Sequence, residues 1–129
     1  MRLLLDTNAL LDMFAQSSRL GPHRRAAIAD PANEVWVSSI SLAELAIKVS
    51  IGKLTMPTSG SIPFPEIAER LGCVNLPFLP EHAERMRTLP LHHRDPFDRM
   101  IIAQALVEDL VVMTTDRQFA AYGVRLVEA

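Results

Sequence analysis

A single cysteine, Cys73, is present in the 129-residue sequence, so a disulfide bond within the chain is excluded. Long apolar runs are also missing, since none reaches the roughly 18 residues that a transmembrane helix requires. The apolar start of the chain resembles a signal peptide only briefly, because Asp6 and Asp12 interrupt it and no small-residue cleavage site follows. We therefore expect a cytoplasmic protein without a membrane span, in which Cys73 is a small core residue.

Tryptophan, tyrosine and lysine are scarce. With one tryptophan, Trp36, and one tyrosine, Tyr122, the chain has too few for a base-stacking platform, and Trp36 is expected in the core. The net charge of −2 also disfavours a nucleic-acid binder with a uniformly basic surface. The basic residues are eleven arginines and two lysines, and arginine is the better residue for bidentate phosphate contacts. Salt-bridged surface arginines explain this bias equally well.

Apolar residues make up 49% of the sequence, which is enough for the core of one domain spanning residues 1–129. Short apolar or β-branched runs alternate with segments of helical periodicity. We expect strands over 3–5, 35–37, 73–76, 110–113 and 124–127. We expect helices over 7–14, 23–29, 41–53, 66–71, 81–89 and 96–108, a helical turn over 117–122 and a proline-rich loop over 55–65. This alternation predicts an α/β fold with a parallel sheet covered by helices on both faces.

Acidic residues recur where an expected strand ends or an expected helix begins. Asp6 ends the first strand, Glu44 falls in the first turn of the helix after the second strand, and Asp116 follows the fourth. Asp95 and Asp98 open the helix that precedes the fourth strand. Because right-handed crossovers bring all these points to one edge of a parallel sheet, carboxylates from distant parts of the chain are expected to meet there.

Each of these acids also has a structural explanation. Ser41 and Glu44 have the spacing of a capping box, and Glu44 is also spaced for an ion pair with Lys48. Asp95 precedes Pro96 in the pattern of a helix N-cap, and the helix dipole favours any acid at a helix start. Taken singly, each acid is better explained by such a role, and only their combination favours a site.

Converging carboxylates repel one another, and a bound cation relieves this repulsion. Carboxylate oxygens without histidine or cysteine ligands suit a hard ion, Mg²⁺ or Mn²⁺. One or two such ions support phosphodiester cleavage by activating water and by stabilising the leaving oxygen. The acidic pattern thus indicates metal-dependent hydrolysis of a phosphodiester.

Four segments of the sequence resemble, in the same order, the motifs of the PIN-domain ribonucleases, in particular the VapC-type toxins of bacterial type II toxin–antitoxin pairs. The segments are 4–8, 39–44, 94–99 and 114–119, with the sequences LLDTN, SISLAE, RDPFDR and TTDRQF. The resemblance implies a three-layer α/β/α sandwich with a five-stranded parallel sheet. It implies Mg²⁺- or Mn²⁺-dependent cleavage of single-stranded RNA, and also a homodimer and a cognate antitoxin protein that blocks the site.

The resemblance also assigns residues. The family's metal-binding and catalytic acids correspond in this chain to Asp6, Glu44, Asp98 and Asp116. Asn8 and Thr114 correspond to its supporting polar positions, and Asp95 is a further acid beside the main four. A metal site made of these acids is therefore expected.

Basic residues near the acids in the sequence are candidate RNA contacts: Lys48, Arg94, Arg99 and Arg117. His92 and His93 directly precede the acidic helix. A solvated turn explains these two histidines better than contact with RNA or a role in proton transfer.

Two other functions stay open on the sequence alone. A phosphatase of the haloacid-dehalogenase type also begins with a strand and an aspartate, but it needs a second aspartate where this chain has Asn8. A PIN-fold module that binds RNA or protein without catalysis is the stronger rival, although all four acids are present. Metal-dependent RNA cleavage that is lost on Asp6→Asn substitution would separate the enzyme from the binding module.

Overall fold

The computed structural model describes residues 1–55 and 62–127. Within them, four parallel strands form one sheet in the order β3–β2–β1–β4. The strands are β1 (Arg2–Leu5), β2 (Glu34–Ser38), β3 (Val74–Leu76) and β4 (Val111–Met113). The α-helices are α1 (Thr7–Phe14), α2 (Pro22–Ala29), α3 (Ser39–Ser50), α4 (Phe64–Arg70), α5 (Pro80–Arg87) and α6 (Pro96–Glu108). Two 3₁₀ helices complete the described elements, η1 (Ser18–Leu20) and η2 (Arg117–Tyr122).

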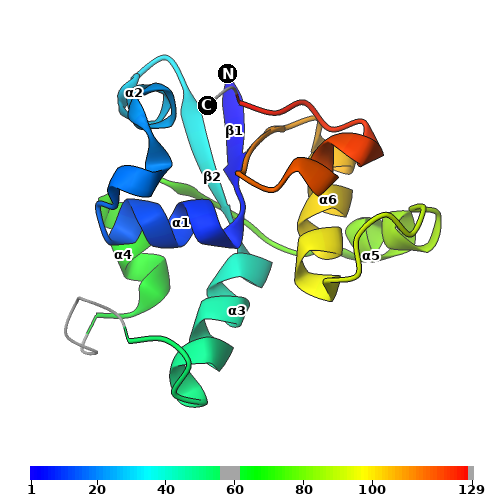
Figure 1. Cartoon of the computed structure of the whole chain (residues 1–129), viewed down its shortest axis with the longest axis horizontal. Helices are drawn as coiled ribbons and strands as arrows, with labels where there is room; N and C mark the ends of the chain where they lie inside the picture. Colours follow the sequence, from blue (N-terminus) through cyan, green and yellow to red (C-terminus); the bar gives the residue numbers. More distant parts are fainter. Residues whose placement is uncertain (56–61, 128–129) are drawn as a thin grey trace.

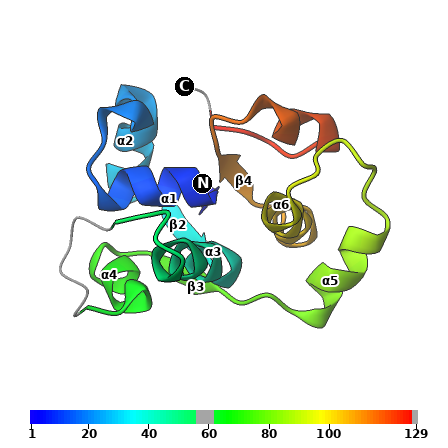
Figure 2. The same cartoon turned by 60° about the horizontal axis from the view of Figure 1, so that its bottom comes forward.

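Alternate residues of the strands divide the core into two layers, because successive side chains of a strand point to opposite faces of the sheet. Leu3 and Leu5 of β1 pack with buried residues of α1 and α4, whereas Leu4 packs on the other face with α6 and η2. Figures 1 and 2 show α1, α2 and α4 on one side of the sheet and α5 and α6 on the other. The architecture is the expected three-layer α/β/α sandwich.

Helix α3 lies at the edge of the sheet where the parallel strands end. It starts directly after β2, extends away from the sheet, and contacts both α1 of one layer and α6 of the other (Figure 1). The carboxyl edge of the sheet is therefore bordered by the start of α1, by α3 and by the start of α6. These elements carry the acids singled out by the sequence.

The sheet has four strands rather than the expected five. In place of a strand over 124–127, one isolated parallel bridge pairs Leu126 with Val112 of β4. Two backbone hydrogen bonds accompany it, from Val112 N to Arg125 O (2.8 Å) and from Val127 N to Val112 O (2.9 Å). These two bonds use both backbone groups of Val112, the middle residue of β4. Because β4 has only three residues, the pairing does not extend into a ladder.

Helices α1 and α6 and the 3₁₀ helix η2 have the expected bounds, 7–14, 96–108 and 117–122. The bounds of the other expected helices and of strands β1 to β4 differ from the expected ones by one to three residues. Helix α3 starts at Ser39 because Ser38 caps it, with its side chain accepting a hydrogen bond from Ile40 N (3.0 Å). The expected loop over 55–65 overlaps the start of α4 at Phe64, and its residues 56–61 lie outside the described residues.

Cys73 and Trp36 are both half-buried and pack against the core. Burial raises the pKa of the Cys73 thiol to about 11, so the thiol is un-ionised at neutral pH, as expected for a core residue. Trp36 lies nearer the margin of the core than expected, because Arg2 covers its ring and its Nε1 donates to Glu34. No helix in residues 1–55 and 62–127 combines the length and the apolar character needed to cross a membrane.

Candidate active site

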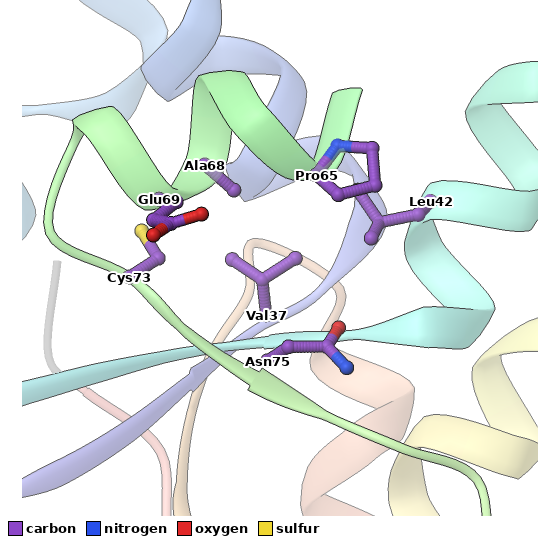
Figure 3. A pocket seen from close by; sticks show the side chains of 7 residues that line it. All are labelled: Val37, Leu42, Pro65, Ala68, Glu69, Cys73 and Asn75. Atoms are coloured by element: carbon purple, nitrogen blue, oxygen red, sulfur yellow. The ribbon is translucent and has the colours of Figure 1, made fainter. Parts of the chain in front are cut away.

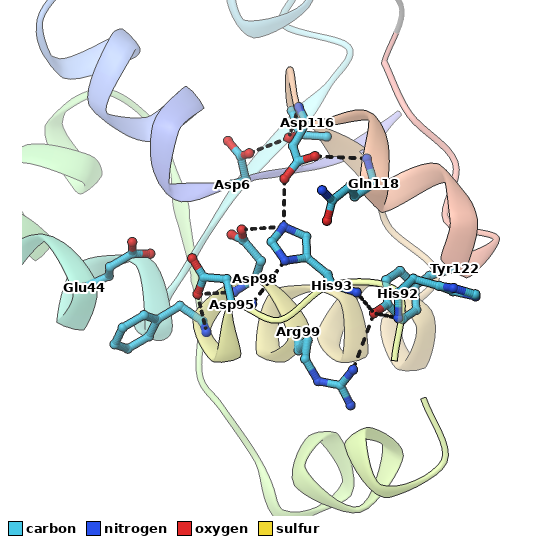
Figure 4. Close-up of polar contacts among 12 residues, drawn as sticks. Asp6, Glu44, His92, His93, Asp95, Asp98, Arg99, Asp116, Gln118 and Tyr122 are labelled. Carbon is cyan, nitrogen blue, oxygen red and sulfur yellow. Dashed lines mark hydrogen bonds and ion pairs between the residues drawn. The ribbon is translucent and has the colours of Figure 1, made fainter. Parts of the chain in front are cut away.

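The acids from four separate elements meet at the carboxyl edge of the sheet, as expected (Figure 4). Asp6 caps α1 directly after β1, and Asp116 caps η2 after β4. Asp98 is the third residue of α6, and Glu44 lies on α3. The charge of Glu44 raises the pKa of both Asp6 and Asp98, so these carboxylates are close in space as well as on the same edge.

Asp6 is buried, with 3% of its surface exposed. Its Oδ1 accepts from Ala9 N (2.8 Å), and its Oδ2 accepts from the hydroxyl of Thr114. Burial raises the pKa of Asp6, and these two hydrogen bonds partly oppose that effect. Repulsion by Asp116 and Glu44 raises the pKa further. A buried carboxylate that is fixed in orientation and destabilised by its acidic neighbours is well suited to bind a cation.

Asp98 shows the same effects more strongly. Burial, together with repulsion from Asp95, Asp6 and Glu44, raises the pKa of Asp98 to about 7. His93 acts in the opposite direction. At neutral pH Asp98 therefore exchanges readily between its protonated and ionised forms, and a bound cation would favour the ionised form.

Glu44 does not form the expected capping box. Because α3 begins at Ser39, Glu44 lies in the second helical turn. The Ser41 hydroxyl instead accepts from Thr7 Oγ1 (3.1 Å). The alternative ion pair is present, with Glu44 Oε2 3.0 Å from Lys48 Nζ. Glu44 is 6% exposed, and its buried Oε1 has no hydrogen-bond partner within the described residues.

Asp95 has the expected capping role, and Asp116 caps η2 in the same way. Oδ1 of Asp95 accepts from Phe97 N (2.9 Å) and Asp98 N (3.4 Å), and Oδ1 of Asp116 accepts from Gln118 N (2.9 Å). Capping uses one oxygen of each carboxylate, so a capping acid can still contribute to the site with its other oxygen. The structural explanation and the functional one are compatible for both residues.

His93 is not part of a solvated turn, and the expectation for it is wrong. Its Nε2 lies 2.7 Å from Asp116 Oδ2 and 3.1 Å from Asp98 Oδ2 (Figure 4). Tyr122, which the sequence did not connect with the site, accepts hydrogen bonds through its hydroxyl from His92 N (3.0 Å) and His93 N (2.7 Å). The two histidines adjacent to RDPFDR were the only signal of this arrangement in the sequence.

The candidate RNA contacts differ in their availability. Arg94 and Arg117 are exposed. Arg99 donates to Pro90 O (3.1 Å) and to Tyr122 (3.4 Å), so it supports the loop before α6. Lys48 pairs with Glu44, as described above. Arg24 of α2, which the sequence did not single out, reaches Thr114 O (3.3 Å) beside Asp6.

Asn8, the other expected supporting residue, is exposed on α1, directly after the buried residues Asp6 and Thr7. The expected supporting role of Thr114 agrees with its hydrogen bond to Asp6. Two side-chain donors to these acids are therefore Thr114, directly after β4, and His93, in the loop before α6.

These residues fit a hard divalent cation. The available donors are carboxylate oxygens, which Mg²⁺ and Mn²⁺ prefer. One of them is the buried Oε1 of Glu44, which has no hydrogen-bond partner among residues 1–55 and 62–127. Carboxylate oxygens of Asp98 and Asp116 also lie within 4.8 Å of one another, close enough to share an ion. A cation here would relieve the repulsion that raises the pKa of Asp6 and Asp98.

A separate cleft of about 330 Å³ lies between α3 and α4, over β2 and β3. Figure 3 shows its lining side chains, which are Val37, Leu42, Pro65, Ala68, Glu69, Cys73 and Asn75. None of these residues belongs to the acidic cluster. The cleft is largely apolar and lacks convergent charged groups, so the acidic edge is the better candidate for chemistry.

Comparison with known proteins agrees with this fold. The family model "PIN domain" matches residues 3–124. A structure of VapBC2 from Rickettsia felis, bound to a promoter DNA fragment, is similar with a TM-score of 0.68 and 18% identity, covering 98% of this chain and 97% of that chain. DNA-bound VapBC from Salmonella typhimurium has a TM-score of 0.66 and 22% identity, with coverage of 98% and 96%. VapBC-5 from Mycobacterium tuberculosis has a TM-score of 0.60 and 23% identity, with coverage of 99% and 98%.

Among curated proteins, no sequence matches the chain. The family model nevertheless covers nearly the whole length, from Leu3 in β1 to Val124, which lies two residues after the end of η2. It therefore includes every acid of the cluster. The chain belongs to the PIN domain family.

Proposed function

We propose that the chain is a single nuclease domain, residues 1–129, that cleaves single-stranded RNA with the help of Mg²⁺ or Mn²⁺. The observation that carries this proposal is the convergence of Asp6, Glu44, Asp98 and Asp116 at one sheet edge. Two of these acids have raised pKa values, and a third has a buried oxygen without a hydrogen-bond partner in the described part of the chain. Such a cluster is costly for the folded protein unless a cation binds to it.

In this proposal the four acids hold one or two ions. When bound, such an ion makes the phosphate more electrophilic, lowers the pKa of water and stabilises the leaving oxygen. Thr114 and the amide of Ala9 orient Asp6, and the amide of Gln118 orients Asp116. The exposed Arg94 and Arg117 are candidates to bind phosphates of the RNA.

The three similar structures are VapBC proteins, and one is described as a member of a family of toxin–antitoxin systems. We therefore propose that this chain is the toxin of such a pair, acts in the cytoplasm as a homodimer, and is held inactive by an antitoxin. The acid cluster suits inhibition by an arginine or lysine of the antitoxin, because charge-assisted hydrogen bonds to carboxylates are strong and specific. Such a cation would compete with the metal for Asp6 and Asp98.

The test of the enzymatic function is cleavage of a labelled single-stranded RNA by the purified chain. We expect cleavage with Mn²⁺, none with a chelator, and none by the Asp6→Asn variant. Mn²⁺ should also raise the melting temperature of the wild type but not of an Asp6→Ala, Asp98→Ala double variant. RNA that is bound but left intact in the presence of metal would favour the non-catalytic binding module instead.

A further inference from the structure

His93 joins the two acids that come from different parts of the chain. Its Nε2 is 2.7 Å from Oδ2 of Asp116, at the start of η2, and 3.1 Å from Oδ2 of Asp98, in the first turn of α6. The side chain is 12% exposed. One imidazole nitrogen thus contacts one oxygen of each of two carboxylates that the proposed function requires.

The other ring nitrogen fixes the tautomer of His93. Nδ1 lies 3.1 Å from the backbone N of Asp95. A backbone amide can only donate, so Nδ1 must accept, and the proton of the neutral ring is on Nε2. Nε2 is therefore an N–H group that donates to Oδ2 of Asp116 and also contacts Oδ2 of Asp98, and in this arrangement it has no free lone pair for a metal ion.

The backbone of His93 is also fixed. The Tyr122 hydroxyl accepts from His92 N and His93 N, and the edge-on ring of Phe119 lies 6.1 Å from the His93 ring. Phe119 and Tyr122 are buried residues of η2, the element that Asp116 caps. One short helix therefore determines the position of an acid and of its hydrogen-bond donor.

We propose that His93 is a positioning residue, whose Nε2–H holds Asp98 and Asp116 in the orientation that binds a divalent cation. The inference rests on the proposed function, because it concerns the same acids. Donors that orient metal-ligating carboxylates contribute about 10- to 100-fold to metal affinity. A histidine that only stabilises its loop would contribute to the melting temperature but not to metal affinity.

Two substitutions separate these roles. In His93→Gln, the amide nitrogen can occupy the position of Nε2 and still donate to the acids. In His93→Asn, the amide oxygen can occupy the position of Nδ1 and accept from Asp95 N, but no donor reaches Asp98 and Asp116. The pair is matched, because each variant retains one of the two hydrogen-bonding functions of the ring.

The experiment is calorimetric titration of wild type and both variants with Mn²⁺, together with their melting temperatures in chelator. We expect His93→Asn to weaken Mn²⁺ binding about 10- to 100-fold, and His93→Gln to retain affinity within a few-fold.

If either variant does not fold, Tyr122→Phe takes its place, since it releases the His93 backbone without altering an acid, and we expect it to weaken Mn²⁺ binding too. Equal Mn²⁺ affinity of wild type and His93→Asn, or of wild type and Tyr122→Phe, would overturn the inference alone. A wild type that binds no Mn²⁺ would overturn the proposed function and the inference with it.

Discussion

Thr114 donates its hydroxyl hydrogen to Oδ2 of Asp6, across a sequence separation of 108 residues. The same hydroxyl oxygen accepts from Asp116 N (2.9 Å). Thr114 therefore connects the first acid of the chain with the last, at the ends of two adjacent strands, β1 and β4. This connection gives a direct test of how the two halves of the site depend on each other.

Thr114→Val should weaken Mn²⁺ binding about tenfold, because the isosteric side chain can neither donate to Asp6 nor accept from the amide of Asp116. Loss of the donor should also raise the pKa of Asp6 further, since the hydrogen bond favours the ionised form. Calorimetric titration at pH 7 and above measures the affinity. Thr114→Ser, which keeps the hydroxyl, is the control and should bind as wild type. A Thr114→Val variant that binds Mn²⁺ as tightly as Thr114→Ser would contradict a role of the hydroxyl in the site.

Asp98→Asn should stabilise the metal-free protein at pH 8. The pKa of Asp98 is about 7 in the folded protein, against 3.8 as the ordinary value. Between these values the folded state binds more protons than the unfolded chain, so the free energy of unfolding falls as the pH rises through this range. The groups that face Asp98 are Asp95, Asp6 and Glu44, which disfavour its charge, and His93, which favours it.

We expect the stabilisation to be on the order of 2 kcal/mol at pH 8 and close to zero near pH 4. Thermal unfolding in chelator at the two pH values provides the measurement. Glu69→Gln, at an exposed acid outside the cluster, is the control and should show no such pH dependence. A melting temperature of Asp98→Asn below that of wild type at pH 8 would contradict a destabilising charge at Asp98.

The strands, the layers and the four acids could be predicted from the sequence because each depends on local patterns and on general topology. Asp6 and Asp116 are recognisable as acids that follow apolar strands, and parallel strands must end at the same edge. The reduction of the expected strand over 124–127 to a single bridge between Leu126 and Val112 could not be predicted. The length of an edge strand depends on which backbone groups of the neighbouring strand are free to pair. The capping-box alternative for Glu44 fails because Ser38, rather than Ser41, caps the helix, a choice between two nearby serines that the sequence leaves open.

The role of His93 depends on tertiary structure. Its partners, Asp98 and Asp116, come from α6 and from the start of η2, and its backbone is held by Tyr122 from the end of η2. No periodicity or spacing in the sequence reports such contacts. The motif RDPFDR directed attention to the acids alone, while the ring of His93 beside them donates to Asp116 and contacts Asp98.

Glu44→Gln should lower RNA cleavage about 100-fold while changing stability little. The substitution removes the charge of a buried carboxylate whose Oε1 is without a partner among the described residues. Lys48→Met is the matched control, because it removes only the ion pair with Oε2. A half-exposed pair of this kind contributes about 0.5 kcal/mol or less, so Lys48→Met should keep most of the activity. Similar losses of melting temperature and activity in both variants would indicate that Glu44 serves only as the ion-pair partner of Lys48.

The products of RNA cleavage should carry a 5′-phosphate and a 3′-hydroxyl. In the proposed reaction an oxygen of water bonds to phosphorus, the bond from phosphorus to O3′ breaks, and O3′ takes up a proton. The alternative is attack by the 2′-hydroxyl of the RNA itself, which needs a free general base. His93 is unsuited to that role, because its Nδ1 accepts from Asp95 N and its Nε2–H is directed at Asp98 and Asp116.

Mass spectrometry of the fragments distinguishes the two reactions, and an oligonucleotide with a 2′-deoxy group at the cleaved linkage is the control. We expect that substrate to be cut at a rate close to that of the all-ribose RNA. A 2′,3′-cyclic phosphate among the products of the all-ribose RNA would show that the 2′-hydroxyl, and not water, is the nucleophile.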